Sequence, residues 1–211
     1  MEACISCPEC THPSAGQYLL AFDPSDPNAI LGTPIFLTEK SAPGFWVAPL
    51  FPTPWTPGMN LDLVGPFGHG FDLPRSIQRL GLVVLGDTLS RLMPLVHQAA
   101  STHIGMTLFT DLSLPKLPTA VEVYPLATLG GLLDWPDFMA LDVPLERLAD
   151  LRDALGLQHG TRLTCPVQVL ITSPFPCAGM AQCGACAVPA RRGWKLACED
   201  GPVFDLGILK W

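Results

Sequence analysis

Hydrophobic and polar residues follow two different patterns along the chain, and the change falls near residue 75. Before that point, short apolar runs at residues 17–22, 35–38, 45–49 and 61–65 are separated by proline, glycine, aspartate and asparagine. Runs of this length, divided by residues that favour turns, are typical of strands in a small β-barrel or sandwich. We therefore expect residues 1–75 to form an all-β domain.

After this point, continuous apolar strands alternate with helical patterns. Residues 80–85 read Leu-Gly-Leu-Val-Val-Leu, which is typical of a strand buried on both faces of a parallel sheet. Apolar residues then recur at helical spacing up to Ala100, and Asp87 or Thr88 can cap the start of that helix. The pattern predicts four further strands, at residues 105–110, 120–124, 138–141 and 167–171.

Two more helices are expected between these strands. A short one follows Pro125, and the next begins near Pro144 and ends at Gly156. The alternation of strands and helices predicts a parallel α/β domain over residues 76–172. Ligands of such domains lie beyond the carboxyl ends of the strands. The apolar stripe of the second helix consists of Leu145, Leu148, Leu151 and Leu155.

Composition limits the function classes. Apolar residues make up 48% of the 211 residues, which allows a substantial core in one or two domains. A formal net charge of −7 argues against nucleic-acid binding. The sequence shows neither a basic-then-apolar leader nor an apolar stretch near 18 residues, so it predicts neither secretion nor a membrane span. A cytoplasmic location is the expectation.

The C-terminal part contains the strongest chemical signal. Cys177, Cys183 and Cys186 form a C-x5-C-x2-C loop, and Cys198 follows after eleven residues. Plant-type ferredoxins bind a [2Fe-2S] cluster through the similar spacing C-x4-C-x2-C followed by a distant cysteine. Small residues between these cysteines allow tight backbone turns that point amide groups at anionic sulfurs. We expect residues 173–211 to form a [2Fe-2S] loop module.

Two alternatives remain for these four cysteines. A structural zinc ion uses the same thiolates, but zinc sites commonly combine two short cysteine pairs, and only one short pair is present. Disulfides are disfavoured in a reducing compartment.

A second cysteine group lies at the N-terminus. Cys4, Cys7 and Cys10 have C-x2-C-x2-C spacing, and His12 follows closely. These four residues could form a Cys3His zinc site. The same three cysteines could instead hold a [4Fe-4S] cluster with Cys165, which precedes proline, as the fourth ligand. An unmetallated tail is the third interpretation.

With these residues identified, the chain resembles the electron-transfer subunit of type B dihydroorotate dehydrogenase, an iron–sulfur member of the ferredoxin reductase superfamily, in a divergent and shortened form. Residues 193–204 end in Cys-Glu-Asp-Gly-Pro-Val-Phe, which is similar to the closing motif of that family's [2Fe-2S] domain. Residues 55–71 look like its junction between the flavin-binding barrel and the nucleotide domain. The order of barrel, α/β domain and cluster loop also agrees.

The resemblance implies FAD and a [2Fe-2S] cluster in a non-catalytic subunit that passes electrons between NAD(H) and the FMN of a separate catalytic flavoprotein. It further implies a hetero-oligomer and a role in pyrimidine biosynthesis. The rival interpretations are a non-redox structural or regulatory subunit with zinc-bound cysteines, and a complete flavoenzyme that oxidises NADH alone.

Several departures from the family bear on the cofactors. The family's Arg-x-Tyr-Ser-like flavin motif is not found, and the first domain is short, so FAD is left open. The glycine-rich phosphate turn is replaced by residues 85–91, where Asp87 puts a carboxylate against a phosphate. Nucleotide binding there is disfavoured. The cluster loop contains one residue more than the usual spacing.

A few other side chains could act near the cofactors. His69, between two glycines, either faces a flavin or cluster or is a solvated turn residue. Trp194 and Phe204 are expected to shield the cluster from water. Three basic residues in the closing segment could balance the charge of the cluster or dock an acidic partner: Arg191, Arg192 and Lys195.

Overall fold

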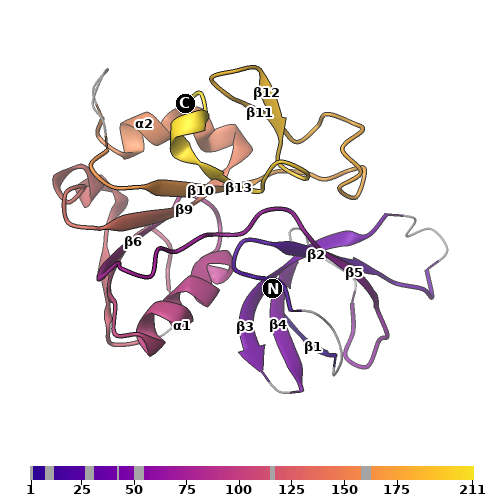
Figure 1. Cartoon of the computed structure of the whole chain (residues 1–211). Coiled ribbons are helices and arrows are strands. Elements are labelled where there is room, and N and C mark those ends of the chain that lie inside the picture. The colour runs from indigo at the N-terminus through magenta and orange to yellow at the C-terminus, as the bar shows by residue number, and fades with distance from the viewer. Residues whose placement is uncertain are drawn as a thin grey trace.

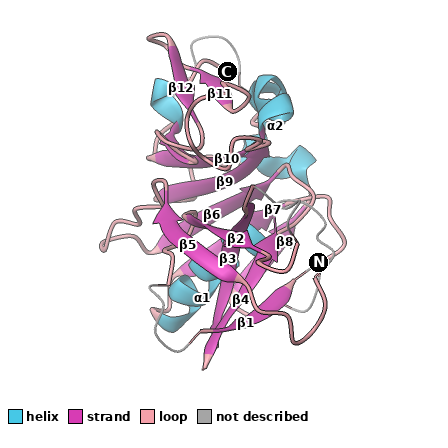
Figure 2. Cartoon of the chain, turned by 90° about the vertical axis from the view of Figure 1, so that its right-hand side faces the viewer, coloured by secondary structure: helices cyan, strands magenta, loops and turns pink. Residues whose placement is uncertain are grey.

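The structure is a computed structural model that describes residues 2–7, 12–26, 31–41, 43–49, 55–114, 117–157 and 163–211. Two large β-sheets form its framework, as Figure 1 shows, with the N-terminal strands on one side and the α/β part and C-terminal segment on the other. In the perpendicular view of Figure 2, the larger sheet is stacked above the N-terminal one.

The N-terminal sheet is antiparallel and has the strand order β1-β4-β3-β2-β5 among the described residues. The four predicted strands are present, and β1 is an unpredicted addition that contains Cys4. Because β1 and β5 are edges of this sheet among the described residues, the predicted small β-barrel is not confirmed. The strands are β1 (Ala3–Ser6), β2 (Tyr18–Phe22), β3 (Thr33–Ser41), β4 (Gly44–Pro49) and β5 (Asp62–Phe67).

The larger sheet has the strand order β13-β10-β9-β6-β7-β8. All neighbouring strands are parallel except β13, which is antiparallel to β10. The predicted parallel α/β arrangement is therefore confirmed, but the strand expected to be the last is followed by another at the sheet edge. The strands are β6 (Arg79–Val84), β7 (Gly105–Phe109), β8 (Val121–Tyr124), β9 (Phe138–Pro144), β10 (Val167–Thr172) and β13 (Val203–Asp205).

Helices are short in the described part of the chain. Helix α1 (Met93–Ser101) follows a 3₁₀ turn (Ser90–Leu92) and buries Leu95, Val96 and Ala99. It begins later than predicted, although the hydroxyl oxygen of Thr88 accepts a hydrogen bond of 3.0 Å from the N–H of Ser90. The remaining helices are 3₁₀ segments at Leu126–Gly131, Leu145–Asp150 and Leu206–Ile208, and α2 (Leu151–Ala154).

The predicted helix over residues 145–155 is mostly a 3₁₀ connector, with one α-helical turn at its end. Its leucine stripe is still the buried face, because Leu148, Leu151 and Leu155 belong to the main core. Gly156 ends it with a φ of +61°, as expected of a helix C-terminus.

The C-terminal segment packs onto the α/β sheet. It contains the hairpin of β11 (Ala187–Pro189) and β12 (Trp194–Leu196), followed by β13. Val188 and Cys198 belong to the same core as Val169 of β10, so this segment and the sheet share one hydrophobic interior. None of the described helices is long and apolar enough to cross a membrane.

Candidate iron–sulfur site

The cysteine loop begins at the carboxyl end of a parallel strand. Strand β10 ends at Thr172, and the loop that follows contains Cys177, Cys183 and Cys186 before β11 begins. Cys198 comes after β12, so the hairpin brings it back to the loop. The position beyond the sheet's carboxyl edge is the one predicted for a ligand site of an α/β domain.

The loop backbone contains several left-handed turns. Gly179 and Gly184 have φ values of +77° and +69°, and Ala178 and Ala181 have +48° and +58°. An alanine in this region costs about 1–2 kcal/mol, so the surrounding packing must hold these two residues in place. The expectation that small residues allow tight turns here is borne out.

These turns point backbone amides at the sulfur atoms. The N–H groups of Gln182, Cys183 and Met180 face Cys177, and together with the Cys183 thiol they lower its pKa to about 6 against the opposing effect of burial. The N–H of Ala185 lies 3.5 Å from the Cys183 Sγ. Metal ligation requires thiolates, and these donors stabilise the charged form.

The four thiols are arranged as two pairs. The Sγ atoms of Cys186 and Cys198 lie 3.3 Å apart, and both residues are buried. The Cys183 thiol forms a hydrogen bond with Cys177, and Cys183 is exposed. Cys177 is buried as well, so Cys183 is the one of these four cysteines that is exposed. Burial, followed by the contact with Cys186, raises the pKa of Cys198 to about 12.

Two thiol pairs fit a binuclear cluster, in which each iron takes two cysteine sulfurs. A single zinc ion would require at least three ligands that converge on one point. Over the described ranges, no three histidine, cysteine, aspartate or glutamate side chains meet that geometry. No disulfide joins the described cysteines either.

The turn after Cys198 is held by Asp200, which the sequence analysis missed. Its carboxylate accepts hydrogen bonds from Lys195 Nζ at 2.7 Å and from the N–H of Leu196 at 2.8 Å. Lys195 therefore stabilises the closing turn. Because aspartate before glycine is a turn signal, the Asp-Gly pair in the closing motif could have suggested this role.

The two aromatic residues expected to cover the cluster behave differently. Phe204 is buried under Gly201, where an added methyl group would lie 2.5 Å from its ring. Trp194 is 70% exposed, so the prediction that it shields the cluster is wrong. It lies at the start of β12, beside the exposed Arg191 and Arg192 of the hairpin turn.

The two motifs that suggested a family resemblance meet in space. The backbone of His69, just after β5, pairs with Pro202 in the closing motif, and its N–H donates to the carbonyl of Gly201. A side chain at Gly68 would collide with that same carbonyl. The side chain of His69 is exposed, so its contribution is a backbone link between the N-terminal sheet and the cluster segment.

The N-terminal cysteines are only partly described. Cys4 is exposed within β1, Cys7 packs against the core of the N-terminal sheet, and Cys10 lies outside the described residues. The ring of His12 packs against Phe45 with 4.9 Å between centroids. A metal site at this group stays a prediction.

Cys165 is not brought to this group. It precedes β10, whereas the N-terminal strand meets the other end of the parallel sheet, where Glu2 contacts Ser90. A six-residue strand such as β10 spans roughly 20 Å. The structure therefore argues against Cys165 as a fourth ligand for Cys4 and Cys7.

The turn after β6 contains an ion-pair network where the family has a phosphate loop. Arg91 Nε lies 2.8 Å from Asp142 Oδ2, and Arg91 Nη2 lies 3.2 Å from Asp87 Oδ1. Burial opposes the charge of Arg91, but the two carboxylates raise its pKa. Arg91 therefore stays charged inside the protein, and Asp142 and Asp87 balance its charge. The weakened nucleotide site stays a prediction.

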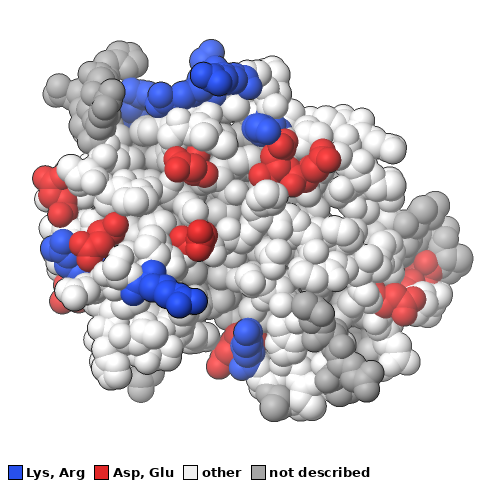
Figure 3. Space-filling model, in the orientation of Figure 1, with Lys and Arg blue, Asp and Glu red and all other residues white. Residues whose placement is uncertain are grey.

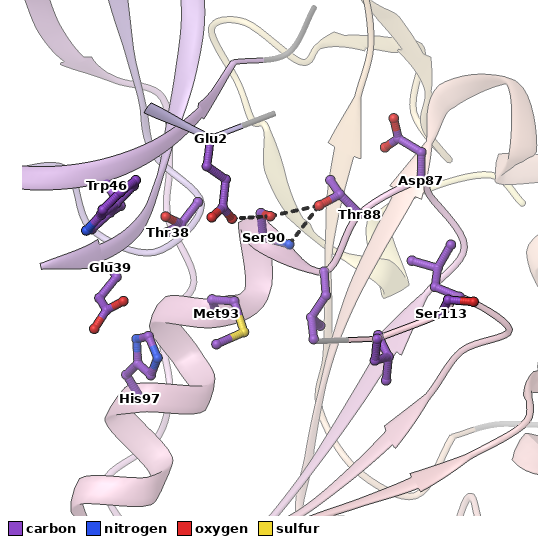
Figure 4. Close-up of a pocket in the computed structure, with 13 residues that line it drawn as sticks. Glu2, Thr38, Glu39, Trp46, Asp87, Thr88, Ser90, Met93, His97 and Ser113 are labelled. Atoms are coloured by element: carbon purple, nitrogen blue, oxygen red, sulfur yellow. Dashed lines mark hydrogen bonds between the residues drawn. The ribbon is translucent and has the colours of Figure 1, made fainter. Parts of the chain in front are cut away.

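A cavity of about 500 Å³ lies between this turn and the N-terminal sheet (Figure 4). Its acidic lining residues are Glu2, Glu39 and Asp87, and no described lysine or arginine lines it. The Ser90 hydroxyl donates a hydrogen bond of 2.6 Å to Glu2. This lining does not suit a ligand that carries phosphates.

Comparison with known proteins supports the assignment of the cysteine segment. Residues 177–210 match the family model of the iron-sulfur cluster binding domain of dihydroorotate dehydrogenase B. The chain is also similar to the structure of the NADH-dependent reduced ferredoxin-NADP oxidoreductase, an enzyme of flavin-based electron bifurcation. That match has a TM-score of 0.71 and 16% identity over 94% of this chain and 80% of the other.

A second similar structure is an intact type IV self-sufficient cytochrome P450 monooxygenase. Its TM-score is 0.51 at 15% identity, and the match covers 87% of this chain but 32% of that one. Likenesses at these identities show a shared fold. The resemblance of the cysteine segment to that family's iron–sulfur domain is thus confirmed over residues 177–210.

Proposed function

We propose that this chain, whose residues 177–210 belong to the iron–sulfur cluster binding domain of the dihydroorotate dehydrogenase B family, is the electron-transfer subunit of an oxidoreductase complex. It holds a [2Fe-2S] cluster and relays electrons between a flavin- or NAD(H)-dependent donor and a catalytic flavoprotein subunit of the FMN dehydrogenase type. Dihydroorotate dehydrogenase is the foremost partner. The ligands are Cys177, Cys183, Cys186 and Cys198.

The arrangement of four thiols in two pairs, with backbone amides directed at them, is the observation that carries this proposal. When bound, the cluster supplies one-electron chemistry without making or breaking a substrate bond. The chain's residues have three tasks. They hold the sulfurs, exclude water from the three buried cysteines, and leave Cys183 close to a partner. Hydrogen bonds from amides to sulfur would raise the reduction potential.

The C-terminal segment has exposed side chains that are suited to protein contact. Met180 is 56% exposed and Trp194 is 70% exposed, although large apolar side chains are usually buried. Arg191 and Arg192 add positive charge beside the tryptophan. Figure 3 shows lysine and arginine side chains along the edge where Figure 1 places α2 and the β11–β12 hairpin. An acidic partner surface around an electron acceptor fits this face.

The first experiment tests the cluster itself. Anaerobically purified or reconstituted protein should be red-brown, contain two irons and two acid-labile sulfides per chain, and bleach with dithionite. Cys186→Ser should lose the cluster, whereas Cys165→Ser, outside the loop, should keep it. Four sulfides per chain would contradict the cluster type, and a colourless zinc protein would support a structural subunit instead.

The second experiment tests the partner. The chain should co-purify with a catalytic flavoprotein subunit and restore electron transfer from dihydroorotate to an external acceptor. The complex is expected in the cytoplasm, whose reducing conditions suit thiol ligands. A cluster-loaded chain that transfers no electrons to that subunit would contradict the dihydroorotate assignment but leave the cluster intact.

A further inference from the structure

The N-terminal sheet touches a cluster ligand directly. Tyr18, on β2, has no exposed surface, and its hydroxyl donates a hydrogen bond of 2.9 Å to the backbone carbonyl of Cys198. These residues are 180 positions apart in the chain. The bond therefore ties the sheet to the closing end of the cluster segment.

Aromatic rings fill the space around this bond. The ring centroid of Tyr18 lies 5.1 Å from Phe175 in the cluster loop, 5.7 Å from Phe67 and 6.1 Å from Phe36. The last two belong to β5 and β3 of the N-terminal sheet. Such spacings are those of aromatic rings in direct contact. The protein's own aromatic side chains thus fill the space between the N-terminal sheet and the cluster loop.

The loop also approaches the phenol closely. A methyl group at Gly179 would lie 2.5 Å from the Tyr18 hydroxyl oxygen, and Gly179 has a φ of +77°. Only glycine combines this conformation with so short an approach. A planar flavin ring has no room between Tyr18 and the loop.

The cavity between the turn after β6 and the N-terminal sheet offers no alternative site for a flavin or a nucleotide. FAD and NAD(H) both carry a diphosphate, and the cavity presents the carboxylates of Glu2, Glu39 and Asp87. The Glu2 carboxylate is bound by Ser90, at the start of the helical segment where a phosphate would gain from the helix N-terminus. Arg91 is buried in its pair with Asp142. The residues that line this cavity therefore do not fit a dinucleotide.

We infer that the N-terminal sheet of this chain clamps the cluster loop through Tyr18 instead of holding a flavin, so that the cluster is the redox centre and its donor and acceptor are both other proteins. The statement that the cluster is the redox centre rests on the proposed function, in which the four cysteines bind that cluster. Tyr18 acts as a positioning residue, since it touches the backbone of a ligand and not the metal.

A flavin titration tests the claim that the N-terminal sheet does not bind a flavin. Anaerobically purified protein should contain no FAD or FMN, and adding either flavin should leave its fluorescence unquenched. NADH should not bleach the cluster without a second protein. Binding of one FAD per chain would overturn the inference. This titration is independent of the cluster, because metal-free protein can be titrated in the same way.

Variants of the tyrosines test the clamp. Tyr18→Phe keeps the ring and removes one hydrogen bond, so it should speed cluster loss to a chelator by about two- to tenfold. It should also shift the reduction potential. Tyr124→Phe is the matched control, because Tyr124 is the only other tyrosine and its hydroxyl bonds Glu122 on the surface. Equal rates for the two variants would overturn the clamp.

A glycine pair provides a second comparison. Gly179→Ala should accelerate cluster loss, whereas Gly184→Ala, which has a similar positive φ but no atom within 4 Å of the added methyl group, should have a smaller effect. If no cluster forms in the parent protein, the proposed function fails. Thermal unfolding of the metal-free protein then tests whether Tyr18 holds the loop. The Tyr18→Phe variant should unfold at a lower temperature than the Tyr124→Phe variant.

Discussion

Arg91 Nε lies 2.8 Å from Asp142 Oδ2, and this ion pair is buried between the turn after β6 and strand β9. Burial raises the pKa of Asp142, which Arg91 partly offsets, and the second carboxylate oxygen of Asp142 has no hydrogen-bond partner among the described residues. The pair fixes the start of the α1 segment on the sheet. Each partner therefore depends on the other to remain buried.

Arg91→Met should lower the free energy of unfolding by about 3–5 kcal/mol, because it leaves the Asp142 carboxylate buried without compensation. Urea denaturation of the metal-free protein measures this loss. The double variant Arg91→Met/Asp142→Leu should recover much of it, since both charges are removed. Arg79→Ala, which breaks an exposed ion pair, is the control, and a loss as small as in this control would contradict the argument.

A surface carboxylate makes stability depend on acidic pH. Asp137 accepts hydrogen bonds from Arg79 Nη2 at 2.6 Å and from the N–H groups of Gln78 and Arg79, and the Arg79 contact is the main reason that its pKa is lowered. A folded-state pKa below the unfolded value means that this stabilisation is complete above the unfolded pKa and is lost as pH falls through the folded pKa.

Asp137→Asn should therefore be less stable than the parent near neutral pH. The two melting temperatures should converge as pH falls through the lowered folded-state pKa of Asp137, because the carboxyl group is then protonated in the folded and the unfolded protein alike. Thermal unfolding across this pH range checks the expectation. A constant difference at every pH would show that the side chain acts through packing and not through its charge.

The sequence predicted the parts of the fold that rest on long apolar runs. Strands β6 and β10 are continuous apolar segments, and each is recognisable without its neighbours. The strands that were missed, β1, β11, β12 and β13, have three or four residues each and are defined by tertiary pairing. Such short segments do not show the alternation of apolar and polar residues over several positions on which strand prediction depends.

Ligand spacing was likewise predictable, but the surroundings of the ligands were not. The four cysteines are recognisable because cluster chemistry dictates their type and approximate spacing. Burial of individual aromatics depends on where distant segments pack, so Trp194 was misjudged and the contact of Tyr18 with Cys198 was not foreseen. A residue 180 positions from its partner leaves no local pattern.

The edge strand β1 is held by a close backbone approach that a single methyl group should disturb. A Cβ atom at Gly44 would collide with the carbonyl of Ile5, the residue before Ser6, which is the partner of Gly44 in the β1–β4 ladder. Gly44→Ala should release β1, so that amide hydrogens of residues 3–6 exchange faster while those of β6 stay protected. Gly131→Ala, where no atom lies within 4 Å and φ is not positive, is the control. Unchanged exchange in β1 would contradict the predicted collision.

The exposed tryptophan should be an anchor for the partner. Trp194→Ala should weaken the complex with the catalytic subunit by roughly thirtyfold or more, because truncation of a central interface tryptophan typically costs about 2 kcal/mol or more. Since Trp194 is 70% exposed, the iron and sulfide content of the chain should not change. Surface plasmon resonance with the cluster-loaded chain gives the dissociation constant.

Charge reversal on the β11–β12 hairpin distinguishes electrostatic steering of the partner from apolar packing of Trp194 against it. Arg191→Glu/Arg192→Glu should slow association with an acidic partner, and raising the salt concentration should reduce the difference from the parent, because exposed charges are screened. Val123→Ala is the control for both variants, since Val123 is 48% exposed but lies on β8, at the opposite edge of the sheet from β13. If Val123→Ala weakens the complex as much as Trp194→Ala does, the partner does not bind specifically at the β11–β12 hairpin. The proposed docking face would then be wrong.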